Sequence, residues 1–129
     1  MKIEHLAIWV EDLEAIKNFY IKYFDMMCGE KYFNAQKDFS SYFLFFKGSE
    51  TRIEIMHRPD ILKNKDIKGL TIGITHFAIS VGSKEIVNSI TEQLRVDKYI
   101  IQSEPRTTGD GYYESVVLDP EGNLIEITE

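Results

Sequence analysis

The sequence has little cysteine and no long hydrophobic run. Its one cysteine, Cys28, excludes an internal disulfide bond and favours a reducing compartment. No apolar stretch approaches the roughly 20 residues needed to cross a bilayer, and residues 1–5 lack the apolar core of a secretory signal. These features predict a cytoplasmic protein that does not work in a membrane.

Basic residues are also scarce. Lysine and arginine together number 15 against 21 acidic residues, which gives a net charge of −6. Binding to nucleic acid depends on basic side chains that neutralise phosphates, so a nucleic-acid partner is not expected. With 43% hydrophobic residues in 129 positions, the composition is that of a globular chain, and we expect a single domain over residues 1–129.

The chain contains an internal repeat. Residues 3–10 (IEHLAIWV) return as residues 74–81 (ITHFAISV), and residues 52–56 (RIEIM) return as residues 124–128 (LIEIT). The two matches occur in the same order in both halves. The sequence therefore predicts two modules, about 1–60 and about 74–129, joined by a lysine-rich connector at about 60–73.

Each module shows the same order of elements. An alternating strand comes first, and a helix follows, capped by Asp12 in module one and by Ser83 in module two. The second helix is expected to bury a stripe of Ile86, Ile90 and Leu94. Three further strands follow each helix, near 30–36, 40–47 and 51–57 in module one and near 99–104, 112–118 and 123–128 in module two. This order predicts an α+β fold of two tandem βαβββ modules, whose curved sheets form an open cup-like barrel with the helices outside.

Four residue positions that suit a metal ion recur in the repeat: His5, Glu54, His76 and Glu126. Apolar residues that flank them point to the opposite strand face: Leu6 beside His5, Ile53 and Ile55 beside Glu54, Phe77 beside His76, and Ile125 and Ile127 beside Glu126. Two imidazoles and two carboxylates suit a divalent transition ion, because zinc and its neighbours accept both ligand types and the carboxylates balance the charge. Taken singly, each side chain would be read as solvent-facing, so the prediction depends on their matched positions.

Aromatic residues are expected around the same cup. Trp9 shares a strand face with His5, and Tyr112 and Tyr113 follow a glycine-bearing loop, so these three are predicted to line a substrate pocket. The apolar run at 42–46 predicts core together with a pocket or dimer surface.

The two His-x-Ala-Ile strands, the duplicated βαβββ order and the ending Asp119-Pro120-Glu121-Gly122-Asn123-Leu124-Ile125-Glu126 resemble the vicinal oxygen chelate superfamily. This group contains glyoxalase I, extradiol dioxygenases and bleomycin-resistance proteins. The resemblance covers essentially the whole chain. It implies a metal held by His5, Glu54, His76 and Glu126, a set similar to that of bacterial glyoxalase I.

The resemblance implies a metal-dependent isomerase or lyase, similar to lactoylglutathione lyase, that acts on a small 2-oxo or 2-hydroxy substrate through a metal-stabilised enediolate. Glu54 or Glu126 would be the base, and the admissible ions are nickel, zinc, cobalt, manganese and iron. The family habit also implies a homodimer. Two alternatives stay open: a protein that binds an antibiotic or metabolite without turnover, and an iron-dependent extradiol-type dioxygenase.

Overall fold

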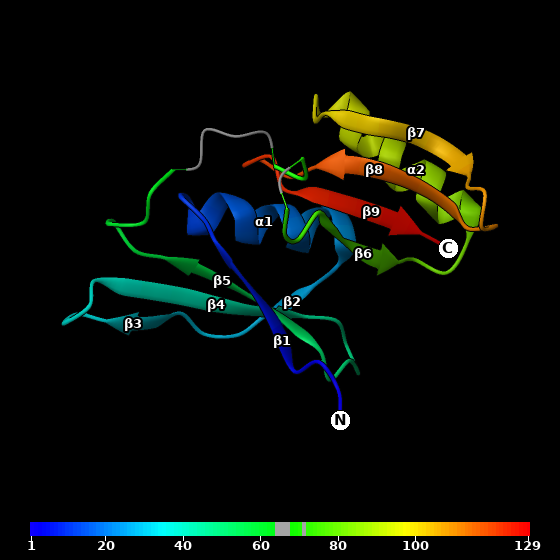
Figure 1. The fold of residues 1–129 in the computed structure, drawn as a ribbon. Coiled ribbons are helices and arrows are strands. Elements are labelled where there is room, and N and C mark those ends of the chain that lie inside the picture. Colours follow the sequence, from blue (N-terminus) through cyan, green and yellow to red (C-terminus); the bar gives the residue numbers. More distant parts are fainter. Residues whose placement is uncertain (64–67, 71) are drawn as a thin grey trace. The chain divides into compact units, whose positions relative to one another are not determined.

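The computed structural model describes residues 1–63, 68–70 and 72–129, which divide into two compact units, Met1–Asn64 and Lys65–Glu129. The boundary lies within the expected connector, of which residues 64–67 and 71 are outside the described part. Each unit contains one helix and one mixed sheet, and the helix packs against strands of its own sheet (Figure 1). Neither described helix is long and apolar enough to span a membrane.

The first unit contains β1 (His5–Trp9), α1 (Leu13–Phe24), β2 (Met27–Cys28), β3 (Tyr32–Asn34), β4 (Phe39–Phe45) and β5 (Arg52–His57). The sheet order is β1-β5-β4-β2, and β3 also pairs with β4. The strand expected at 30–36 is present as the shorter β3, and the two-residue strand β2, which was not expected, precedes it. Between them, the Gly29 N–H donates to the Phe43 carbonyl at 3.0 Å, outside the regular ladder.

The second unit contains β6 (His76–Ser80), α2 (Lys84–Val96), β7 (Ile101–Thr107), β8 (Tyr113–Leu118) and β9 (Leu124–Thr128). Its sheet has the order β6-β9-β8-β7. In each module the first strand is parallel to the last strand, which is its neighbour in the sheet. The predicted α+β class is confirmed, as is the βαβββ order in module two; module one has the same order with the short strand β2 added after α1.

The two helices begin where the caps predict. The Asp12 carboxylate accepts hydrogen bonds from the N–H groups of Glu14 and Ala15, and the Ser83 hydroxyl accepts one from Ile86. Helix α1 ends at Phe24, and its C-cap residue Asp25 takes a left-handed conformation with φ 53°. The Asp12 and Ser83 caps satisfy N–H groups that have no partner inside a helix.

The helices cover their sheets with residues at equivalent positions. In α1 the buried stripe is Ile16, Tyr20 and Tyr23; in α2 it is Val87, Thr91 and Leu94. Of the expected stripe Leu94 is buried, but Ile90 is half-buried and Ile86 is 44% exposed, so that part of the expectation is wrong. Thr91 takes a core position because its hydroxyl bonds the Val87 carbonyl and the Ser115 hydroxyl, each at 2.7 Å.

Candidate functional site

The parallel pairing of strands puts each predicted histidine on the same sheet face as its glutamate. Ala7 of β1 lies opposite Glu54 of β5, and Ala78 of β6 lies opposite Glu126 of β9. Side chains alternate between the faces of a strand, so the histidine two residues before each alanine shares the face of the glutamate. The apolar residues between them point toward the helix. The repeat thus produces the same pair in both modules.

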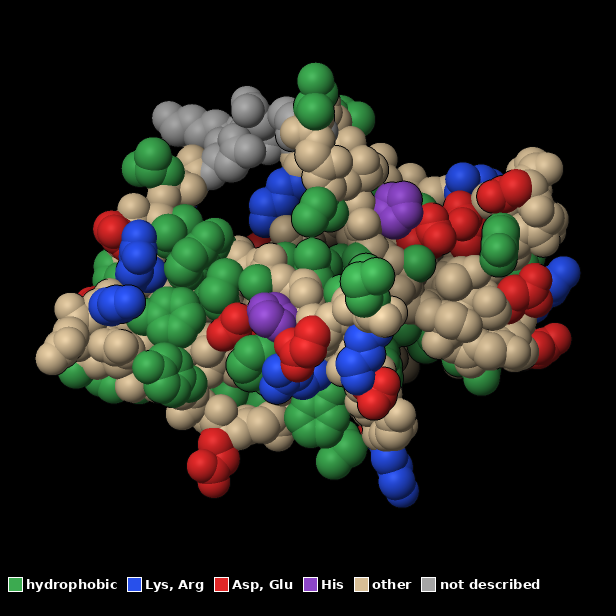
Figure 2. All heavy atoms as spheres, turned by 60° about the horizontal axis from the view of Figure 1, so that its bottom comes forward, with side chains coloured by type: hydrophobic (Ala, Val, Ile, Leu, Met, Phe, Trp, Pro, Cys, Tyr) green, Lys and Arg blue, Asp and Glu red, His purple; other side chains and the backbone are tan. Residues whose placement is uncertain are grey.

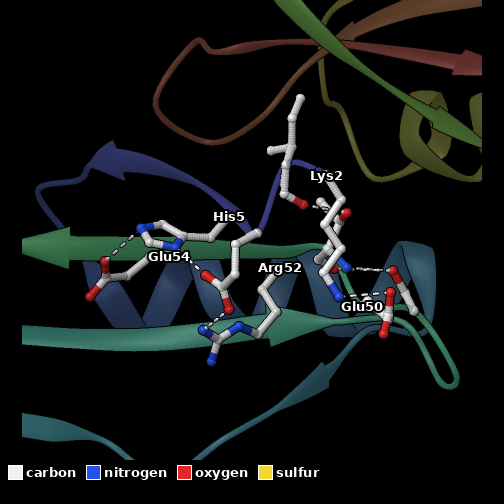
Figure 3. Close-up of polar contacts among 9 residues, drawn as sticks. Lys2, His5, Glu50, Arg52 and Glu54 are labelled. Atoms are coloured by element: carbon white, nitrogen blue, oxygen red, sulfur yellow. Dashed lines mark hydrogen bonds and ion pairs between the residues drawn. The ribbon is translucent and has the colours of Figure 1, made fainter.

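The histidine and the glutamate of each pair face one another. The distance from Nε2 of His5 to Oε2 of Glu54 is 3.9 Å, and that from Nε2 of His76 to Oε2 of Glu126 is 3.4 Å. Both histidine side chains are 40% exposed, whereas the glutamates are 16% and 19% exposed. Figure 3 shows His5 and Glu54 pointing toward each other from neighbouring strands. Each pair is therefore open to a ligand from solvent while its carboxylate is held in the sheet.

A tight turn fixes the strand that carries Glu126. The Asp119 carboxylate, on a residue that is only 4% exposed, accepts hydrogen bonds from the N–H groups of Glu121 and Asn123 at 2.9 and 2.8 Å. Gly122 takes φ 79°, a conformation that glycine adopts without strain. Burial raises the pKa of Asp119, and its hydrogen bonds partly offset that shift. The turn sets the register in which Val116 of β8 lies opposite Glu126.

The surroundings of the pair in module one are polar and aromatic. Nδ1 of His5 hydrogen-bonds the Glu4 carboxylate, which also pairs with the Arg52 guanidinium. The hydrogen bond to His5, with a smaller contribution from Arg52, lowers the pKa of Glu4. Arg52 and His5 both contact the Phe43 ring, at 3.9 Å to the ring centroid and at 5.6 Å between ring centroids. Both nitrogens of His5 therefore have a carboxylate partner.

Module two has a different neighbour, Glu114, which the sequence analysis did not single out. Glu114 lies on β8 two residues before Val116, and hence on the face of Glu126, and it is 8% exposed. Burial, together with the charge and the hydrogen bond of Glu126, raises the pKa of Glu114. Arg106 opposes that shift from 3.4 Å. The alternation of side chains along the strand at 112–118 could have identified Glu114, once the residue opposite Glu126 was known to be Val116.

The aromatic residues expected around the cup do not share one environment. Trp9 lies on the strand face of His5, is 40% exposed and packs edge-on against Phe39 at 6.1 Å. Tyr112 is 58% exposed and precedes β8. Tyr113 points the other way, because its hydroxyl donates to the Asn88 side chain of α2 at 2.9 Å. Tyr113 is thus on the helix side of the sheet, away from Glu126.

Hydrophobic side chains gather beside a histidine and acidic side chains on the surface in Figure 2. Trp9 and Tyr32 both contact Phe39, at 6.1 and 6.0 Å between ring centroids. Strand pairing puts Tyr32 and Phe39 on the face of β4 that also carries Phe43, opposite Glu54. Module one therefore presents an aromatic surface next to its His–Glu pair.

The separation of the donor atoms in each pair can be compared with that of two ligands on one divalent ion. Two ligand atoms that each lie about 2.1 Å from one ion are about 3.0 Å apart at a right angle and about 3.4 Å apart at the tetrahedral angle. The separation in module two matches the tetrahedral value, and that in module one is somewhat wider. Among the described residues of each module, no three His, Cys, Asp or Glu side chains form a group that could hold a metal. One module by itself therefore supplies two donors, fewer than a protein site for these ions normally uses.

The chain resembles solved structures of glyoxalase type. Glyoxalase I from Zea mays is 24% identical with a TM-score of 0.81, and the match covers 98% of this chain but 44% of the maize protein. The trypanothione-dependent glyoxalase I of Leishmania major is 23% identical with a TM-score of 0.79, covering 100% of this chain and 86% of that one. A glyoxalase family protein from Enterococcus faecalis is 21% identical with a TM-score of 0.78, covering 99% and 97%. These likenesses concern the fold, and this chain spans less than half the length of the maize enzyme.

No curated protein sequence matches the chain. The family model of the glyoxalase/bleomycin resistance protein/dioxygenase superfamily matches residues 2–127, nearly the whole length. This match includes both His–Glu pairs and the Asp119 turn. The chain therefore belongs to the glyoxalase/bleomycin resistance protein/dioxygenase superfamily.

Proposed function

We propose that the protein is a metal-dependent isomerase or lyase of glyoxalase type that acts on a small 2-oxo or 2-hydroxy substrate. The observation that carries this function is the repeated His–Glu pair, found at the same register position of both modules in a chain of this superfamily. Simple binding does not explain why two imidazoles and two carboxylates face solvent in matched pairs. A polar pair on each sheet does suit an ion that both pairs share.

In this function His5, Glu54, His76 and Glu126 hold one divalent ion: nickel, zinc, cobalt, manganese or iron. Since each module supplies two donors, the complete ligand set combines both modules, from one chain or from two copies. Two carboxylates balance the double positive charge, so the occupied site is neutral. A bound ion of this kind supplies Lewis-acid stabilisation of negative charge on adjacent substrate oxygens.

One of the two glutamates acts as the base in this function. A carboxylate that takes a proton from one substrate carbon and returns it to the neighbouring carbon needs both solvent access and a fixed position. Glu54 and Glu126 have both, since their side chains are 16% and 19% exposed and lie on central strands of their sheets. Both are candidates for the base.

The test is proton exchange at the α-carbon of 2-oxo thiohemiacetals, followed by NMR in deuterated water with each candidate ion loaded in turn. Wild-type protein should exchange the proton faster than buffer. Replacing the base by glutamine, in Glu54→Gln or Glu126→Gln, should slow exchange by about 10²–10⁴-fold. Glu50→Gln is the matched control, because the Glu50 side chain is 76% exposed and pairs with Lys2 at 2.7 Å, away from the His5–Glu54 pair of the same module (Figure 3). If wild type and all three variants match the uncatalysed rate across the substrate panel, the enzymatic function is wrong.

A second candidate function is the capture of an aromatic antibiotic or metabolite without turnover. The aromatic surface of module one, formed by Trp9, Tyr32 and Phe39, favours it. Trp9 is the single tryptophan of the chain, so its fluorescence reports directly on this surface. Tight quenching by an aromatic ligand, together with no catalysed proton exchange, would replace the enzyme by the binding protein.

We also propose that the protein is a cytoplasmic homodimer. Phe43 and Phe45 of β4 lie on the open face of the first sheet with Glu54 and Arg52 opposite them, and both are only half-buried. Apolar side chains left half-buried on an open sheet face suit a second copy. Light scattering at micromolar concentration should give twice the mass of one chain, and a monomer would remove this part alone.

A further inference from the structure

We infer that Glu4 is a positioning residue that orients His5, through a contact with no counterpart at the equivalent position of module two. Glu4 accepts a hydrogen bond from Nδ1 of His5 with one carboxylate oxygen and pairs with Arg52 through the other. This role rests on the proposed metal site, because it concerns how His5 presents its second nitrogen. Figure 3 shows His5, Arg52 and Glu54 close together on neighbouring strands.

The two nitrogens of a neutral histidine differ, since one carries a proton and the other offers a lone pair. A carboxylate partner accepts a proton and cannot donate one, so Glu4 holds the proton on Nδ1. The lone pair is then on Nε2, the atom that faces Glu54 at 3.9 Å. A histidine that binds a metal through one nitrogen commonly has the other fixed by such a hydrogen bond.

Arg52 makes the position of Glu4 specific. Its guanidinium takes Oε1 of Glu4, which leaves Oε2 for the histidine. The backbone N–H of Arg52 also donates to the Glu4 carbonyl at 3.0 Å, which holds the residue beside β5. Arg52 and His5 share the Phe43 ring as a packing surface, so the histidine ring is restrained on a second side.

Module two lacks this arrangement at the equivalent positions. The residue before His76 is Thr75, and the residue opposite His76 on β9 is Leu124, where module one has Arg52 opposite His5. A threonine and a leucine supply neither the carboxylate nor the guanidinium. The two histidines therefore occupy the same backbone position, but the carboxylate and guanidinium beside His5 are replaced by Thr75 and Leu124 beside His76.

The first test is the tautomer of His5 in metal-free protein, measured by ¹⁵N–¹H correlation of the imidazole nitrogens. Wild-type His5 should carry its proton on Nδ1, and Glu4→Ala should move the proton to Nε2 in a substantial share of molecules. Glu4→Gln should also lose the wild-type tautomer, because Arg52 takes its single amide oxygen and its NH₂ group then faces Nδ1 as a donor. The same tautomer in wild type and in Glu4→Ala would overturn the positioning role.

The second test is titration of the same proteins with zinc. Glu4→Ala and Glu4→Gln should both weaken binding by about 10- to 100-fold, and the matched control Thr75→Ala should bind like wild type. Wild-type affinity in Glu4→Ala contradicts the positioning role and leaves the metal site intact. Failure of wild type to bind zinc, nickel, cobalt, manganese or iron contradicts the proposed function instead, and the tautomer measurement then still decides what Glu4 does to His5.

Discussion

The two modules repeat their backbone and their His–Glu pair but surround the pair differently. In module one the supporting carboxylate, Glu4, is exposed and bonds the histidine. In module two the supporting carboxylate, Glu114, is buried and bonds the glutamate. Strand register and alternation fix what the repeat retains, whereas the residues beside the pair are free to diverge. The difference indicates that both modules present a histidine and a glutamate, but that a neighbouring carboxylate contacts the histidine in module one and the glutamate in module two.

The helix cores give the largest expected contrast between the modules. Tyr20 of α1 and Thr91 of α2 occupy equivalent buried positions at 0% and 1% exposure. Tyr20→Ala should lower the free energy of unfolding by about 3–5 kcal/mol, because it leaves a large cavity. Thr91→Val should lower it by about 1–3 kcal/mol, because the buried Ser115 hydroxyl loses its partner.

Urea denaturation measures both effects, and the double variant Thr91→Val/Ser115→Ala is the control. Removing both hydroxyls leaves no unpaired polar group, so the double variant should be more stable than Thr91→Val. A double variant less stable than the single one would show that the hydroxyl pair is not what holds Thr91 in the core.

Glu114 should make the metal-free protein less stable at neutral pH. Its pKa is raised above the ordinary 4.5, first by burial and then by Glu126, so the folded state holds this proton more tightly than the unfolded state. The resulting penalty is present above the raised pKa and disappears as the pH falls toward 4.5. Glu114→Gln should therefore be more stable than wild type at pH 7, and the two should converge at acidic pH. A constant difference in unfolding free energy between pH 7 and pH 4.5 would contradict this.

Glu14 in module one should change the free energy of unfolding with pH in the opposite direction to Glu114, and by a smaller amount. Hydrogen bonds from Lys17 and then Tyr42 lower the pKa of Glu14 to about 2. Its contribution to stability is present above pH 4.5 and is lost as the pH falls toward about 2. Because Glu14 is 49% exposed, solvent screening keeps this contribution below about 1 kcal/mol.

Unfolding of Glu14→Gln and wild type should differ at pH 7 and become equal near pH 2. Glu14→Gln and Glu114→Gln together compare the two modules. Acid removes a stabilising charge at Glu14 in module one and a destabilising charge at Glu114 in module two. The same direction of change in both variants would show that the two carboxylates are not controlled by their own modules.

Much of the fold follows from the sequence because the repeat tests each element twice. The caps Asp12 and Ser83, the strand alternation around both histidines and the α+β class are local patterns that the structure confirms. Strand β2 was not predicted, since a two-residue strand has no periodicity of its own. The exposure of Ile86 was also not predicted. The apolar pattern placed Ile86 in the core, whereas the helix buries the face that carries Thr91, whose hydroxyl bonds Ser115.

The site was predicted only as far as the repeat extends. The positions of His5, Glu54, His76 and Glu126 on matching faces depend on strand register, which the repeat supplies. Tyr113 was placed by its nearness in sequence to the pocket residues, and one step of strand alternation puts it on the helix face instead. Neither the Glu4 contact nor the Glu114 contact has a counterpart in the other module, so the repeat could not reveal them.

The most direct test of the central claim is calorimetric titration of chelator-treated protein with nickel and zinc, comparing wild type with one double variant of each module. If both pairs hold one ion, wild type should bind one ion per chain. His5→Ala/Glu54→Gln and His76→Ala/Glu126→Gln should then each lose binding by more than the roughly 100-fold expected for a supporting residue. Two results would contradict a metal site shared by the two modules. One is a wild type that binds none of nickel, zinc, cobalt, manganese and iron; the other is a double variant that keeps the wild-type affinity and stoichiometry.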